Sequence, residues 1–203
     1  MQKFTEKSEF FFIRHGQLMP PYLDHLKMDY ATLADLSTGV LDPGINDSAP
    51  ELLARQTTGV DFSQVSVVYY NNSGKSSQRS LESANHIVHY LKSKGVDPTL
   101  RGLPDIHEVD FDVRGLLSEF EFKHSGMPAI RMALYNAAVN GGATEPLAKI
   151  AKRIKVLQNL VSTHDANGES VLFVTHDFFM RFLEVYITRQ DRLDGANVSD
   201  LGK

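Results

Sequence analysis

Four side chains suited to phosphate chemistry each come shortly after an apolar, β-rich run of the sequence. The planar fork of an arginine bonds two phosphate oxygens at once, which lysine cannot do. A histidine can attack phosphorus and hold a phosphoryl group covalently. The four are Arg14 and His15 after residues 10–13, Arg79 a loop after residues 66–70, and His176 after residues 171–175. Brought together, they would bind a phosphoryl group and accept it.

A carboxylic acid is the remaining part of such a site, because the departing oxygen needs a proton. Glu108 and Asp110 lie at the end of a weaker extended stretch from about Leu100 to Val109, and Asp177 directly follows His176. Three acids therefore compete for one role. We expect Glu108 to fill it, with Asp177 as the alternative acid.

The apolar runs have the composition of buried strands. FFFI, SVVYY and VLFVT are short and rich in aromatic or β-branched residues, which is typical of a parallel sheet covered on both faces. Ligands of such sheets bind beyond the carboxyl ends of the strands. The basic and acidic residues above fall at these ends, so the fold would gather residues that are far apart in sequence.

Helical spacing of apolar residues predicts helices between the strands. Ser48 to Glu51 has the Ser-x-x-Glu spacing of a capping box, with Pro50 in the first turn. The predicted helices are one from Ser48, one over Leu81–Leu91 that Gly95 ends, one from near Pro128 through Ile130 and Ala137, one from Leu147 to near His164, and one from Phe178 to about Thr188.

Strands that alternate with helices indicate an α/β fold, here a three-layer α/β/α sandwich around a mostly parallel central sheet. The sequence shows no internal repeat and no low-complexity linker, so residues 1–203 are expected to form one domain. No final strand is evident beyond Arg189, and residues 190–203 are expected to form a poorly ordered tail.

Composition excludes several classes of protein. The 203 residues include no cysteine, which removes disulfides, thiolate catalysis and cysteine-held zinc. A net charge of −4 gives no basic excess for nucleic acid. The polar N-terminus and the short apolar run after it lack the length of a signal peptide or membrane span. A cytoplasmic protein without nucleic-acid or membrane partners is expected, and the sequence does not indicate its oligomeric state.

The basic motifs resemble those of the histidine phosphatase superfamily, also called phosphoglycerate mutase-like. Arg14-His15-Gly16 after an apolar strand is similar to its first motif, RSLESA at 79–84 to its Arg-x-x-Gln-(Thr/Ser)-Ala segment, and VTH at 174–176 to the strand with its second histidine. Further matches are Arg181 five residues after His176, a degraded Gly-Gly-Glu-Ser segment at 140–145, and Arg153 on the helix that follows.

The resemblance implies a mechanism and a role for each residue. His15 would be the nucleophile and become phosphohistidine, Glu108 would be the proton donor, and the phosphoryl oxygens would be bound by Arg14, Arg79 and His176. It implies no cofactor, and a small phosphorylated molecule as substrate. Arg181 is expected to be structural and to pair with an acid behind the site.

The sequence departs from the family pattern in three places. Lys75 replaces a small hydroxyl residue four positions before Arg79, and FDVRG at 111–115 stands where a Trp-Glu-Gly is common. Asp177 replaces the glycine after the second histidine, and His-Asp is the pattern of the acid phosphatase branch. Pro20 also fits that branch, but Leu18 replaces its second arginine, so the small intracellular branch is the better match.

A phosphatase is expected rather than a mutase, because QLMPPY at 17–22 does not resemble the mutase segment. The loop 17–46 would help to set the substrate, with Tyr22, His25, Lys27 and Tyr30 as candidates to line its pocket. Two alternatives remain open: a catalytically weakened phosphate-binding or regulatory protein of the same fold, and a phosphatase that acts on phosphohistidine in proteins.

A metal site is not expected. His107 and Glu108 are adjacent, but the helical His-Glu-x-x-His pattern is missing because position 111 is phenylalanine. The family resemblance likewise implies neither a metal nor an organic cofactor.

Overall fold

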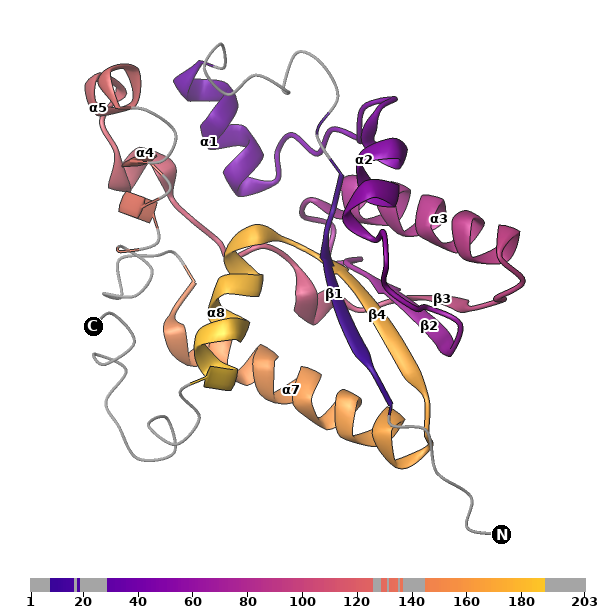
Figure 1. Ribbon diagram of the computed structural model, residues 1–203. Coiled ribbons are helices and arrows are strands. Elements are labelled where there is room, and N and C mark those ends of the chain that lie inside the picture. Colours follow the sequence, from indigo (N-terminus) through magenta and orange to yellow (C-terminus); the bar gives the residue numbers. More distant parts are fainter. Residues whose placement is uncertain are drawn as a thin grey trace, which may run out of the picture.

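The centre of the molecule is a parallel sheet of four strands in the order β1-β4-β2-β3 (Figure 1). The computed structural model describes residues 8–16, 18, 29–125, 129–130, 132–134, 136 and 145–188, without the side chains of residues 52, 56, 185, 187 and 188. The strands are β1 Phe10–Arg14, β2 Val65–Tyr70, β3 Thr99–Gly102 and β4 Ser170–Thr175. The first and last of the described strands, β1 and β4, are therefore neighbours.

Helices connect and cover these strands. They are α1 Tyr30–Thr38, α2 Ala49–Gln56, α3 Ser77–Ser93, the 3-10 turn η1 Pro104–Ile106, α4 Val113–Leu116, α5 Glu119–His124, α7 Leu147–Ala166 and α8 Asp177–Thr188. The described residues between 129 and 136 are also helical, and Ile130 and Leu134 there are buried.

Two apolar clusters, one on each face of the sheet, hold the layers together. On one face, Phe173 of β4 packs with Ile154 of α7 and Phe179 of α8. On the other, Leu172 of β4 packs with Ile87 and other apolar residues of α3. Adjacent residues of one strand face opposite ways, so β4 contributes to both clusters and is buried throughout. The predicted three-layer α/β/α sandwich is confirmed (Figure 1).

The three strong strand predictions are confirmed, but the weak one from Leu100 to Val109 is wrong in its second half. β3 ends at Gly102, and η1 begins at Pro104. Proline has no backbone N–H for the sheet and its fixed φ suits the first turn of a helix. The chain therefore turns away from the sheet and delivers Glu108 from a loop.

The predicted helices are confirmed where the structure describes them, although Pro128 and Ala137 of one of them lie outside the described residues. One predicted cap is wrong. Ser48 precedes α2 with helical backbone angles, and its hydroxyl donates to the side-chain oxygen of Asn46 at 2.8 Å rather than capping the helix. A true capping box begins α5, where Ser118 and Glu121 bond each other's backbone. Gly95 follows α3 with φ of +85°, as expected of a helix stop.

The short helices α1, α4 and α5 were not predicted. Tyr30, at the start of α1, donates its hydroxyl to the carbonyl oxygen of Leu117 and lies 5.8 Å from the ring of Phe122. It ties α1 to the segment of α4 and α5. Tyr22, His25 and Lys27 lie outside the described residues, as do Pro20 and residues 140–144 and 190–203. Among the helices described, none combines the length and apolar character needed to cross a bilayer.

Candidate active site

The two histidines meet where β1 and β4 end. Arg14 is paired with Thr175 across the two strands, and the N–H of His15 continues the ladder by donating to the carbonyl oxygen of Thr175 at 3.0 Å. His15 and His176 therefore leave the sheet side by side, with ring centroids 4.8 Å apart. Parallel pairing alone brings together two residues from opposite ends of the chain.

The ring of His15 has a defined orientation. Its Nδ1 lies 2.7 Å from the carbonyl oxygen of Gly16, which can only accept, so Nδ1 carries the proton and Nε2 keeps its lone pair. Burial, followed by the charges of Arg79 and Arg14, holds the pKa of His15 well below its usual range. The imidazole is thus neutral near pH 7, with Nε2 free to act as a nucleophile.

The backbone just after His15 is fixed by two helices. The N–H of Gly16 donates to the hydroxyl of Ser83 at 2.8 Å, and that hydroxyl donates to the carbonyl oxygen of Arg79 at 2.6 Å. A Cβ at position 16 would lie 2.7 Å from the Cβ of Ala49 in α2, far inside van der Waals contact. Glycine is therefore required for the approach of α2, whatever the backbone angles.

His176 is fully buried, and its tautomer is set by Asn71. The amide nitrogen of Asn71 donates to the carbonyl oxygen of Lys75 at 2.6 Å, while its oxygen accepts the N–H of Ser73, so the orientation of the amide is fixed. The same nitrogen lies 3.3 Å from Nε2 of His176, which must accept. The proton is consequently on Nδ1, and this N–H has no partner among the described residues.

Burial also lowers the pKa of His176 well below its usual range, followed by the charges of His15 and Arg79. The ring stays neutral and offers one donor. A neutral donor beside His15, without a partner among the described residues, is suited to an oxygen of a bound anion.

Arg79 supplies the charge of the site from the first turn of α3. Its side chain is 9% exposed, one terminal nitrogen donates to the hydroxyl of Ser76, and Nε has no partner in the described part of the chain. Ser76 has φ of +52°, a conformation that costs a non-glycine residue free energy. The strained turn thus presents the hydroxyl that orients the guanidinium. Arg14 lies at the exposed end of β1, close enough for its charge to affect His15 and Arg79.

Glu108 reaches the site from the loop after η1. One carboxylate oxygen accepts the N–H of Val109 at 2.9 Å and the N–H of Phe179, in the first turn of α8, at 3.2 Å. Burial raises the pKa of Glu108, although these N–H groups and the charge of Arg79 act in the opposite direction. A carboxyl group with a raised pKa keeps its proton at higher pH, as a general acid must.

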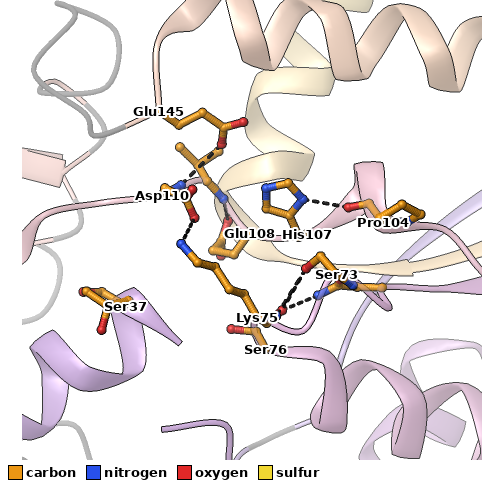
Figure 2. A network of polar contacts seen from close by, with 12 residues as sticks. Ser37, Ser73, Lys75, Ser76, Pro104, His107, Glu108, Asp110 and Glu145 are labelled. Carbon is orange, nitrogen blue, oxygen red and sulfur yellow. Dashed lines mark hydrogen bonds and ion pairs between the residues drawn. The ribbon is translucent and has the colours of Figure 1, made fainter. Parts of the chain in front are cut away.

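The alternative acid, Asp177, is the first residue of α8 and half-buried. Both candidate acids therefore lie at the start of the same helix, one in its first turn and the other bonded to it. Asp110 is engaged elsewhere, because its carboxylate accepts from the ammonium group of Lys75 at 2.9 Å (Figure 2). Lys75 stands where the family pattern has a small hydroxyl residue. It thus pairs with Asp110, the third of the candidate acids.

A buried ion pair holds the loop that carries Glu108. Arg153 of α7 donates to Glu145 at 2.7 Å, to the carbonyl oxygen of Asp105 at 2.8 Å and to that of His107. Its guanidinium also lies 4.5 Å from the centre of the ring of Phe179. One side chain thus contacts both the loop before Glu108 and the helix turn that binds its carboxylate.

No motif in the sequence predicted a role in the site for Asn71, Ser76 or Ser83, although Ser83 lies within the matched segment 79–84. No function was predicted for Arg153 or Glu145. Both residues had, however, been matched to the family pattern: Glu145 to the degraded Gly-Gly-Glu-Ser segment and Arg153 to the helix after it. That match could have indicated a role near the site. Arg181 was expected to pair with an acid, but its side chain lies exposed on α8.

Comparison of sequences identifies no relative: no protein-family model and no curated protein matches the chain. Comparison of structures does. A mycobacterial glucosyl-3-phosphoglycerate phosphatase matches with a TM-score of 0.61 and 14% identity, over 97% of this chain and 84% of its own. A phosphoglycerate mutase from Bacillus anthracis gives 0.56 and 16%, over 93% and 83%. The ecdysone phosphate phosphatase of Bombix mori, in complex with tungstate, gives 0.54 and 16%, over 94% and 82%. The chain therefore has the phosphoglycerate mutase-like fold that these structures share.

Proposed function

From this phosphoglycerate mutase-like fold, we propose that the protein is a phosphatase that hydrolyses a phosphomonoester through a phosphohistidine on His15. The observation that carries the proposal is the hydrogen-bonding state of three nitrogen atoms. They belong to His15, to His176, whose ring centroid lies 4.8 Å from that of His15, and to Arg79, whose charge acts on both rings. Nε2 of His15 has a lone pair, while the buried Nδ1–H of His176 and Nε–H of Arg79 have no partner among the residues described. A nucleophile beside two unpaired donors suits a tetrahedral oxyanion.

The first step would transfer the phosphoryl group to the protein. Nε2 of His15 attacks phosphorus, and the bond from phosphorus to the ester oxygen breaks. Glu108 gives its proton to the departing oxygen, which leaves as an alcohol. Arg14, Arg79 and His176 bind the charge that spreads over the three equatorial oxygens.

The second step would return the protein to its starting state. Glu108, now a carboxylate, takes a proton from water as the water oxygen attacks phosphorus. The bond from phosphorus to Nε2 of His15 breaks and inorganic phosphate is released. Each group ends as it began, and the sequence of steps needs no metal.

Glu108 is the preferred acid over Asp177 because of its surroundings. Burial raises its pKa, and the N–H groups of Val109 and Phe179 hold one of its oxygens and so orient the other. Its charge also acts on Arg79, one of the phosphoryl ligands.

The test is hydrolysis of two esters, an aryl phosphate and an alkyl phosphate, from pH 4 to 9 with a chelator present. An aryl oxide leaves without much help, whereas an alkoxide needs a proton. We expect His15→Ala to lose both activities, and Glu108→Gln to lose roughly 100-fold or more on the alkyl ester with a smaller loss on the aryl ester. Asp177→Asn is the matched control. If Asp177→Asn has the selective defect instead, the assignment of the acid is wrong.

A rapid acid-free quench with labelled substrate tests the intermediate directly. The label should remain on the denatured chain, resist alkali and be released by acid, as expected of a bond from phosphorus to nitrogen. His15→Ala should trap none.

A phosphate-binding protein without turnover is the second candidate, favoured by the aspartate at position 177 and the ion-paired Lys75. It predicts that wild type binds phosphate or vanadate but hydrolyses neither ester and traps no label. That combination of results would replace the phosphatase proposal.

A further inference from the structure

A histidine and two acids lie together behind Glu108, in residues that the proposed mechanism does not use. One potential ligand atom from each of His107, Asp110 and Glu145 lies within 4.8 Å of the other two. Figure 2 shows the three side chains around the loop that follows η1. Nitrogen and carboxylate oxygen in this combination are ligands of transition metals.

The orientation of His107 leaves the correct atom free. Its Nδ1 lies 2.7 Å from the carbonyl oxygen of Pro104 and so carries the proton (Figure 2). Nε2 therefore keeps its lone pair. Histidines that bind metals almost always donate their second N–H to a carbonyl or carboxylate in this way, because the bond fixes the ring and its tautomer.

Glu145 provides an independent observation. The residue is 2% exposed, and its Oε2 accepts from Arg153 at 2.7 Å and from the N–H of Asp110 at 3.4 Å. Its Oε1 has no partner among the described residues. A buried carboxylate oxygen without a donor is unfavourable, and a cation is one group that would satisfy it.

We propose that His107, Asp110 and Glu145 bind one divalent transition-metal ion of the Zn²⁺ class. A metal bonded to each of the three at about 2.0–2.2 Å would hold the ligand atoms roughly 3 to 4 Å apart, so a small closure of the observed cluster suffices. The imidazole favours Zn²⁺ or Co²⁺ over Mg²⁺ and Ca²⁺, which prefer oxygen ligands alone.

Lys75 is the internal competitor of this ion. Its ammonium group lies 2.9 Å from Asp110, and the two side chains are 44% and 19% exposed. Lys75 can therefore withdraw into water when a metal takes Asp110. Arg153 is buried and binds Oε2 of Glu145, which leaves Oε1 for the metal. A divalent ion and the Lys75 ammonium exclude each other, and this gives the proposal a specific test.

The experiment measures metal binding on the full chain after a chelator has been removed, without any substrate. Zn²⁺ is titrated calorimetrically, and Co²⁺ is followed by its visible absorption. We expect one ion per chain, a roughly tenfold or greater loss of affinity in His107→Ala, and tighter binding in Lys75→Met, where the competing cation is gone. Circular dichroism checks that each variant is folded.

Two control variants separate this site from others. His124 also bonds a carbonyl oxygen through Nδ1, at 2.8 Å from Phe120, but does not belong to the cluster, so His124→Ala should bind Zn²⁺ as wild type does. His15→Ala tests the rival pair of His15 and His176, and should also retain the ion.

Loss of binding in His15→Ala but not in His107→Ala would overturn the proposal, as would equal affinity in all variants. Binding that appears only in Lys75→Met would overturn it for the natural chain. None of these readouts depends on hydrolysis, so the metal site and the proposed phosphatase activity stand or fall separately.

Discussion

At the scale of single residues, the candidate site depends on which ring nitrogen carries the proton. Gly16 places the proton of His15 on Nδ1, and Asn71 places that of His176 on Nδ1 as well. One ring is thereby suited to the proposed role of nucleophile and the other to that of donor, although both are histidines with lowered pKa values. Their roles are set by a carbonyl oxygen and an amide nitrogen.

Asn71→Asp should reverse the donor role of His176. A carboxylate accepts, so Nε2 must then carry a proton and the neutral ring has its lone pair at Nδ1. We expect kcat to fall roughly 100-fold at pH 8, and imidazole ¹⁵N spectra to show that the proton has moved. Asn72→Asp makes the same change of charge one residue away on an exposed side chain. If it reduces kcat equally, the added charge rather than the tautomer is responsible.

Gly16→Ala should disturb the nucleophile through steric contact alone. The new Cβ would lie 2.7 Å from the Cβ of Ala49, so α2 or the segment after His15 must shift. We expect a loss of about 1–3 kcal/mol in the free energy of unfolding in urea and a severe loss of kcat. The double variant Gly16→Ala with Ala49→Gly should recover much of both, and failure to recover either would show that the contact is not the cause.

At the scale of elements, the proposed acid, Glu108, lies on a loop, and the buried residues behind it hold that loop in place. Arg153 binds carbonyl oxygens on the segment before Glu108 and lies against Phe179, whose N–H binds the carboxylate. It acts on the acid only through these neighbours, so it is a positioning residue.

Arg153→Met should impair the acid more than the nucleophile. We expect kcat for the alkyl ester to fall more than kcat for the aryl ester. Because Glu145 would be left as an unpaired buried charge, the variant should also lose about 3–5 kcal/mol in the free energy of unfolding. Arg153→Met combined with Glu145→Gln removes both charges and should regain most of the stability but not the alkyl activity. Equal losses on the two esters in this double variant would show a structural role only.

The strands and helices that could be predicted from the sequence are those whose apolar residues form a pattern within a short window. The apolar runs of β1, β2 and β4 and the periodic faces of α3 and α7 are visible in short windows. The capping box predicted at Ser48 was wrong because the backbone there is helical and the hydroxyl donates to the side chain of Asn46. The bonds made by Asn71, Ser83 and Arg153 join segments far apart in the chain. The choice between Glu108 and Asp177 could not be read from spacing, because both reach the start of α8.

At the scale of the whole molecule, the two histidines of the site make the free energy of unfolding depend on pH. His15 and His176 have folded-state pKa values below the unfolded value of about 6.5. Below pH 6.5 the unfolded chain binds more protons at these rings than the folded chain, so unfolding becomes more favourable as pH falls. Above pH 6.5 both states are neutral at these positions and this contribution is constant.

The free energy of unfolding should therefore decrease between pH 7.5 and pH 5. Urea titrations at these two values should show a smaller decrease in the double variant His15→Asn with His176→Asn. Glu108 acts in the opposite direction, because its raised pKa makes the folded chain hold a proton more readily than the unfolded one, but it is the same in both proteins. An unchanged pH dependence in the double variant would contradict the histidine assignment.

The pairing of β1 with β4 also bears on the synthesis of the protein. β1 leaves the ribosome well before its partner in the sheet, β4, is made, because Phe10 of β1 pairs with the distant Val171 of β4 (Figure 1). At about 5–20 residues per second, His15 would wait on the order of ten seconds for His176. During that interval no phosphoryl pocket can exist, so a chain truncated before β4 would carry the nucleophile without ever being able to use it.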